Sequence, residues 1–149
     1  MIDIPANVQI RATIRPGAVF YYDEDTYVGD TPHYFVVLNR DATTTDNLVL
    51  LGATSQVVNA TRRADPYPDT LVVLTPADYP DFAEPQSAFN GNEVVEVSLE
   101  TLVSKLARKQ LKLRTHMDGS LVERLRAAVC ASPVVERRTK KLIDPTWGQ

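Results

Sequence analysis

Cysteine, histidine and glycine are scarce in this sequence of 149 residues, and their scarcity argues against disulfides, metal sites and phosphate-binding loops. The single cysteine, Cys130, cannot form an intramolecular disulfide. The two histidines, His33 and His116, are far apart, and no cysteine or acidic cluster has the spacing of metal ligands, so we expect no metal site. We also expect no cofactor, because the sequence contains no glycine-rich loop of the phosphate-binding types.

Long hydrophobic runs are also lacking. No apolar run approaches the roughly 20 residues that a membrane helix needs. The first residues have neither the basic start nor the apolar stretch of a signal peptide. Hydrophobic residues make up 44% of the chain and charged residues 23%, which is enough apolar material for one core. These features predict a soluble, cytoplasmic protein without a membrane partner.

The net charge of −3 is unevenly distributed along the chain. Residues 1–97 hold 5 Lys and Arg against 14 Asp and Glu, whereas residues 98–149 hold 11 basic and 5 acidic residues. This split indicates two segments. We predict a β domain over residues 1–106 and a basic helical extension over residues 107–149. The extension either packs on the acidic part, or is solvated, or contacts an anionic partner such as RNA.

Two apolar runs of strand length, at 32–39 and 48–56, flank a polar turn and predict a hairpin of mostly buried strands. Polar residues stand at its ends: His33 begins the first run, and Thr54 and Ser55 end the second. The start of one antiparallel strand lies beside the end of the next. We therefore expect these three side chains to lie close together.

Short strand patterns follow one another between residues 17 and 97 without long helices between them, which favours a mainly β fold, a small antiparallel barrel or sandwich. Residues 1–14 are expected to form an edge strand or an extended arm, and residues 59–69 a loop. Asn90-Gly91 has the composition of a hairpin turn between two strands. The other expected strands cover 18–22, 70–74 and 93–97.

Helical periodicity begins after residue 97. Ser98 can cap a helix whose apolar residues, Leu99, Leu102, Val103 and Leu106, have i, i+3, i+4, i+7 spacing. A second helix is expected from residue 120 until Pro133 ends it. Residues 110–117 between them are expected to form an irregular connector.

The residues at the hairpin ends could support metal-independent cleavage of single-stranded RNA, in which a ribose 2′-hydroxyl attacks its neighbouring phosphate. His33 could act as a general acid or base, and Thr54 and Ser55 could donate hydrogen bonds to phosphate. Each of these residues can also be explained by structure alone, as part of a turn, of the core or of a solvated loop. The candidate RNA-binding residues, which could stack on bases or contact phosphate, are Tyr22, Tyr34, Gln56, Arg62 and Arg63.

The order of these segments resembles the family of MazF/PemK-like toxins. Residues 15–22, beginning Arg-Pro-Gly, resemble the opening strand of that family, and residues 33–39 resemble its second strand. Residues 48–56 are similar to its third strand, which ends in Thr-Ser. The resemblance covers roughly residues 15–106.

The resemblance implies a small SH3-like antiparallel barrel, here with C-terminal α-helices, and a homodimer. It implies an endoribonuclease of a type II toxin-antitoxin system, neutralised by an antitoxin protein. The catalytic threonine of the family matches Thr54, with Ser55 beside it, but its catalytic arginine stands just before the second strand, where this chain has Thr31-Pro32-His33. Either His33 takes over part of that role, or the chain is a non-catalytic SH3-like module that binds a protein or nucleic-acid partner.

Overall fold

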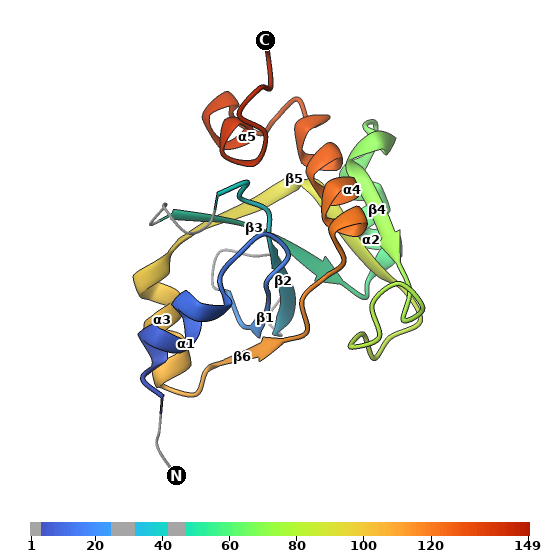
Figure 1. The fold of residues 1–149 in the computed structure, drawn as a ribbon. Helices are drawn as coiled ribbons and strands as arrows, with labels where there is room; N and C mark the ends of the chain where they lie inside the picture. Colours follow the sequence, from blue (N-terminus) through green and yellow to red (C-terminus); the bar gives the residue numbers. More distant parts are fainter. Residues whose placement is uncertain (1–3, 25–31, 42–46) are drawn as a thin grey trace.

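A computed structural model describes residues 4–24, 32–41 and 47–149 of the chain (Figure 1). Within these residues, six strands form one sheet in the order β4-β5-β3-β2-β1-β6, and every neighbouring pair is antiparallel. The expected polar turn at 40–47 lies partly outside the described residues. The strands are β1 (Val19–Tyr22), β2 (His33–Val37), β3 (Asn47–Thr54), β4 (Leu71–Leu74), β5 (Ser87–Ser98) and β6 (Leu111–Arg114).

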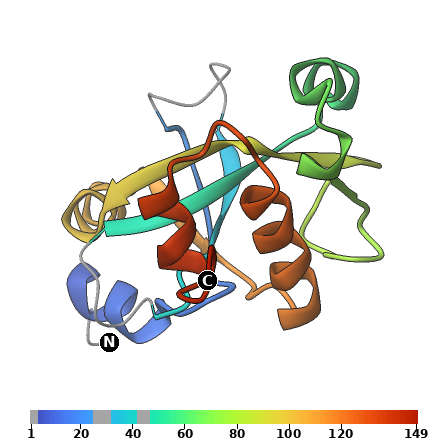
Figure 2. The ribbon, with the colours of Figure 1, turned by 90° about the horizontal axis from the view of Figure 1, so that it is seen from above.

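Helices cover both faces of the sheet. On one face, α1 packs beside α3, and Ile10, Leu99 and Leu102 join a core with Phe20 and Phe35. On the other face, α4 and α5 lie side by side and complete a second core (Figure 2). The helices are α1 (Ala6–Thr13), α2 (Val57–Ala64), α3 (Leu99–Ala107), α4 (Gly119–Cys130) and α5 (Arg137–Ile143). No helix in the described ranges is long and apolar enough to cross a membrane.

The antiparallel arrangement and the helices α3 and α4 are as the sequence predicts, but the fold is mixed α/β rather than mainly β. Helix α1 replaces the expected edge strand, with Ile10 buried within the helix and Ile14 buried just after it, at the C-cap. Helix α2 replaces most of the expected loop at 59–69, and β6 forms within the expected irregular connector. Among the described strands no pairing joins β4 to β6, so the sheet is open and an SH3-like barrel is not confirmed.

Local signals account for the helix that follows β5. Ser98 caps α3, since its hydroxyl accepts a hydrogen bond from the backbone N–H of Thr101 at 3.1 Å, as predicted. Leu99 and Leu102 are buried beneath α3. The last turn of the helix carries Lys105, a cation near the negative end of the helix dipole.

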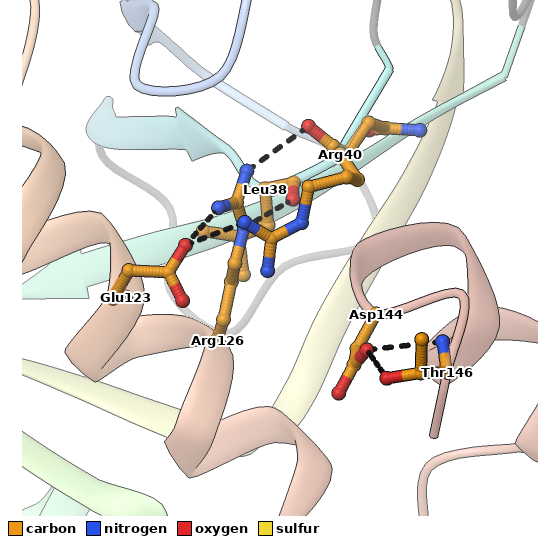
Figure 3. Close-up of polar contacts among 7 residues, drawn as sticks. Leu38, Arg40, Glu123, Arg126, Asp144 and Thr146 are labelled. Carbon is orange, nitrogen blue, oxygen red and sulfur yellow. Dashed lines mark hydrogen bonds and ion pairs between the residues drawn. The ribbon is translucent and has the colours of Figure 1, made fainter. Parts of the chain in front are cut away.

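The basic C-terminal segment is part of the folded domain. Arg126 on α4 is 5% exposed and donates hydrogen bonds to the carbonyl oxygens of Leu38 at 2.9 Å and Asn39 at 3.2 Å (Figure 3). Glu123, one turn earlier, accepts from both Arg126 and Arg40. These contacts tie α4 to the chain just beyond β2. Such hydrogen bonds satisfy backbone carbonyls that would otherwise be buried without partners.

Gly91 allows α4 to pack closely on β5. The expected hairpin turn at Asn90-Gly91 is wrong: β5 continues through this dipeptide, and the register of its pairing with β3 shifts nearby. A Cβ on Gly91 would lie 2.5 Å from the carbonyl oxygen of Ala128 in α4. Glycine is therefore required here for close backbone approach and not for a turn conformation.

We predict that Gly91→Ala lowers the free energy of unfolding by about 2 kcal/mol, because the new methyl group must push α4 away from β5. Gly119→Ala is the matched control, since no atom lies within 4 Å of its added Cβ. The control should change stability by less than about 0.5 kcal/mol. Urea unfolding followed by circular dichroism measures both variants, and equal stabilities would contradict the proposed close packing.

Candidate functional site

The pairing of β2 with β3 brings the predicted polar residues together. Tyr34 lies opposite Ala53 in the antiparallel register, so His33 and the Thr54-Ser55 pair lie at the same end of neighbouring strands, as the sequence predicts. The imidazole Nδ1 of His33 is 3.0 Å from the carbonyl oxygen of Ala53. The hairpin thus positions the histidine through its own backbone.

A groove of about 260 Å³ opens at this strand end, and we call it the His33 groove. His33, Tyr34 and Ser55 line it together with Tyr21 of β1, and the segment 82–87 forms the facing wall with Glu84. A second hollow of about 400 Å³ shares Ser55 and Glu84 with it and continues past Gln56 and the start of α2. The two hollows therefore adjoin along the end of β3.

The tautomer of His33 follows from its contact with Ala53. A carbonyl oxygen can only accept a hydrogen bond, so Nδ1 of His33 carries the proton and Nε2 is the basic nitrogen. Nε2 is buried in this structure. The ring also stands edge-on to Phe35, with centroids 6.4 Å apart. The imidazole is therefore oriented for acid-base chemistry, but the nitrogen that would perform it lies below the surface.

The polar residues after β3 form the entry to α2. The Thr54 hydroxyl accepts a hydrogen bond from the backbone N–H of Gln56 at 3.1 Å, an arrangement typical of a threonine turn. Gln56 in turn accepts from the Asn59 side chain at 2.7 Å. Ser55 is exposed and lines both hollows. Of the two hydroxyls, Ser55 is the one placed to meet a ligand.

Three of the candidate RNA-binding residues, Tyr22, Arg62 and Arg63, do not line the His33 groove. Tyr22 is 1% exposed in the core, where its hydroxyl donates to Glu24, and burial together with this carboxylate raises the pKa of its phenol. Arg63 lies on α2 and pairs with Glu93, Nε to Oε1, at 2.6 Å. Arg62 borders a separate hollow with Pro68. Tyr34 is the candidate tyrosine that reaches the groove.

Tyr21 and the segment 82–87 are functional candidates that the sequence did not reveal. Strand β1 is buried on both faces, so the alternation of its side chains does not tell which tyrosine faces a groove. Residues 82–87, which form the groove wall, have a sequence typical of a loop. They reach the groove because they pack against residues that are distant in the sequence. In the sequence, the one indication that Tyr21 could be a candidate is its position next to Tyr22.

An aromatic cluster forms one side of the groove. The ring of Tyr34 packs against those of Tyr21 and Phe82, with centroids 4.7 and 5.2 Å apart. The guanidinium of Arg114, on β6, lies 5.7 Å from the centroid of the Tyr34 ring. The hydroxyl of Tyr34 donates to the carbonyl oxygen of Asp81 at 2.9 Å. Aromatic and cationic groups are thus adjacent at this edge of the site.

Hydrogen bonds around Asp81 hold the groove wall against the end of β6. The carboxylate of Asp81 accepts from the backbone N–H of Thr115 at 3.1 Å and from the Tyr79 hydroxyl at 3.2 Å. Arg114 Nε lies 3.9 Å from the same oxygen. Burial opposes ionisation of Asp81, but these hydrogen bonds and the arginine charge outweigh it and lower the pKa of the carboxyl. Burial and the Asp81 charge raise the pKa of Tyr79.

The described part of the chain places no group of three or more His, Cys, Asp or Glu side chains where they could hold a metal ion. The chemistry available at the His33 groove is therefore that of an imidazole, a hydroxyl, a carboxylate and aromatic rings.

Comparisons with known proteins give a weak structural likeness. No family model matches the sequence, and no curated protein matches it either. The structure is similar to that of an endoribonuclease in complex with its cognate antitoxin from mycobacterial species, with a TM-score of 0.49 and 12% sequence identity. The likeness covers 78% of this chain and 91% of that one. A likeness of this size does not identify a family or an activity.

We predict that Asp81→Asn lowers the free energy of unfolding by about 1 kcal/mol at neutral pH, because it removes a charged acceptor from the groove wall. A carboxyl whose pKa is lowered on folding stabilises the fold above its ordinary pKa of 3.8, and this stabilisation is lost as the pH falls through the lower folded value. The difference between variant and wild type should therefore shrink in acid.

Urea unfolding at neutral pH and at a pH below 3.8 tests this prediction. Asp69→Asn, at an exposed aspartate elsewhere, is the control and should be nearly neutral at both. A difference for Asp81→Asn that stays constant with pH would show that the charge of Asp81 does not stabilise the wall.

Proposed function

We propose that this chain is a toxin-like, metal-independent endoribonuclease of a type II toxin-antitoxin system, and that it cleaves single-stranded RNA in the cytoplasm. The observation that carries the proposal is the meeting of His33, Ser55 and Tyr34 in one groove at the ends of β2 and β3. The resemblance of residues 15–22, 33–39 and 48–56 to MazF/PemK-like toxins supports it independently.

The proposed reaction needs only groups that the chain supplies and a water molecule. His33 Nε2 takes the proton of a ribose 2′-hydroxyl, whose oxygen attacks the adjacent phosphorus. The bond from phosphorus to the 5′-oxygen breaks, and water protonates the leaving oxygen. Ser55, with Thr54 beside it, donates a hydrogen bond to the phosphate oxygen on which charge develops. Because Nε2 is buried, the proposal requires that bound RNA expose this edge of the ring.

The remaining parts of the proposal follow from the same resemblance. The chain acts as a homodimer, and an antitoxin protein neutralises it. A base stacks on Tyr34, and the RNA continues past Gln56 along the second hollow. Residues 1–106 form the toxin-like unit, and residues 107–149 form a basic extension that adds the strand β6 to its sheet and packs on it.

A second candidate function is a non-catalytic module that binds RNA or a protein. Two observations favour it: no arginine stands directly before β2, and the basic nitrogen of His33 is buried. In this alternative the groove binds a ligand but transfers no proton. Cleavage and binding must therefore be measured separately.

We predict that His33→Ala lowers the rate of RNA cleavage by about 10²–10⁴-fold, the usual contribution of a general acid or base. Ser55→Ala should lower it by about 10-fold, because one hydrogen bond to a charged oxygen is lost. The purified chain is incubated with mixed-sequence RNA in EDTA, without antitoxin, and the products are separated on denaturing gels.

His116→Ala is the matched control for His33→Ala. The Nε2 of His116 lies 3.0 Å from the carbonyl oxygen of Thr13, so this histidine also bonds to backbone, but it does not line the His33 groove. Its removal should leave the cleavage rate within a few fold. Intact RNA with wild-type protein at high concentration would refute the enzyme, and binding of the same RNA would then favour the non-catalytic module.

A further inference from the structure

The proposed reaction calls for a cation near the phosphodiester, and the sequence supplies none directly before β2. Neither Arg62 nor Arg63 lines the His33 groove. Two cations instead reach this side of the sheet from β6, a strand that the sequence did not predict. They are Lys112 and Arg114.

The register of β6 places both cations on the face of the sheet that carries the groove tyrosines. In the β1–β6 pair, Tyr21 lies opposite Lys112 and Val19 opposite Arg114. Side chains of directly opposed residues project from the same face of a sheet. The ring of Tyr21 packs on that of Tyr34, which lines the groove. Lys112, Arg114 and the two tyrosines therefore share one surface.

The side chain of Arg114 is held in place without its donors being consumed. Its guanidinium lies over the ring of Tyr34, and its side chain is 35% exposed. The nearest carboxylate, Asp81, is 3.9 Å from Nε, which is itself buried and makes no hydrogen bond to any described residue, so the terminal nitrogens of the guanidinium are the donors left for a ligand. Asp81 already accepts from Thr115 and Tyr79. An arginine stacked in this way keeps planar donors that match phosphate oxygens.

The surrounding charge also favours an anion at β6. Residues 101–117 contain five Lys and Arg and no Asp or Glu. Lys112 is exposed on the edge strand of the sheet. Glu84 lines the groove itself, so phosphates beyond the one at Ser55 would be repelled there. The phosphates that flank the scissile one are therefore best bound along β6, with the bases toward the tyrosines.

We propose that Lys112 and Arg114 bind the phosphodiester backbone of single-stranded RNA while a base stacks on Tyr21 and Tyr34. This inference rests on the proposed function, because it places beside the same groove the cations that the chain lacks directly before β2. The occupant is single-stranded rather than duplex, because exposed bases are required for stacking on tyrosine.

Fluorescence anisotropy tests this proposal with a 5′-fluorescein-labelled, fully 2′-O-methylated RNA dodecamer of mixed sequence. The methyl groups remove the attacking hydroxyl, so binding is measured without cleavage. Lys112→Gln and Arg114→Gln should each raise the Kd about tenfold at low salt. Each should also reduce the slope of log affinity against log salt by about 0.7, the value for one lost contact to a single strand.

Two variants control for the loss of a positive charge elsewhere. Arg11→Gln lies on α1, which covers the other face of the sheet, and Lys141→Gln lies on α5, at the far side of the molecule from β6 in Figure 1. Both should bind the dodecamer with wild-type affinity and salt slope. Lys112 is exposed, so its variant should fold normally, and thermal melts of all four variants confirm folding.

The outcomes separate this inference from the proposed enzyme. Wild-type affinity and salt slope in both β6 variants would overturn the inference, even if the wild-type chain cleaves unmodified RNA. Weakened binding in both variants, with no cleavage by the wild type, would support the β6 contact and refute the enzyme. Failure of the wild type to bind the dodecamer at low salt would overturn the inference outright.

Discussion

The register of β2 against β3 is the constraint on which the rest of the structure depends. Side chains alternate between the two faces, so Val36 and Leu51 enter one core while Phe35 and Leu50 enter the other. A shift of one residue would exchange these sets and separate His33 from the end of β3. Because helices bury both faces, the same hydrophobic forces that fix the register also fix the groove.

Much of the central sheet and the helices α3 and α4 could be predicted from sequence, whereas α1, α2 and β6 could not. The strands β2 and β3 are apolar runs of strand length on either side of a polar turn, a pattern typical of a hairpin. Helix α1 buries only Ile10 within its span, and α2 buries only alanines, Ala60 and Ala64, which are weak signals. Strand β6 alternates apolar and basic residues over four positions, too short a stretch to separate from a connector.

The residues of the site that lie at strand ends could be predicted from the sequence. Those that reach the site through tertiary contacts could not. His33 and Ser55 meet because antiparallel neighbours must place those ends together. Which tyrosine faces the groove depends on the phase of β1, and the cations of β6 arrive through pairing with β1, distant in sequence. Asp81 holds the groove wall by accepting hydrogen bonds from the backbone N–H of Thr115 and the hydroxyl of Tyr79, and no local sequence pattern indicates these contacts.

The central claim is that this groove directs attack of a ribose 2′-hydroxyl on the adjacent phosphate without a metal. The most direct measurement is mass spectrometry of the RNA fragments that the purified chain produces in EDTA. The account predicts 5′-hydroxyl ends paired with 2′,3′-cyclic phosphate ends, because the attacking oxygen stays bonded to phosphorus. Fragments with 5′-phosphate ends, or RNA that stays intact in EDTA, would contradict it.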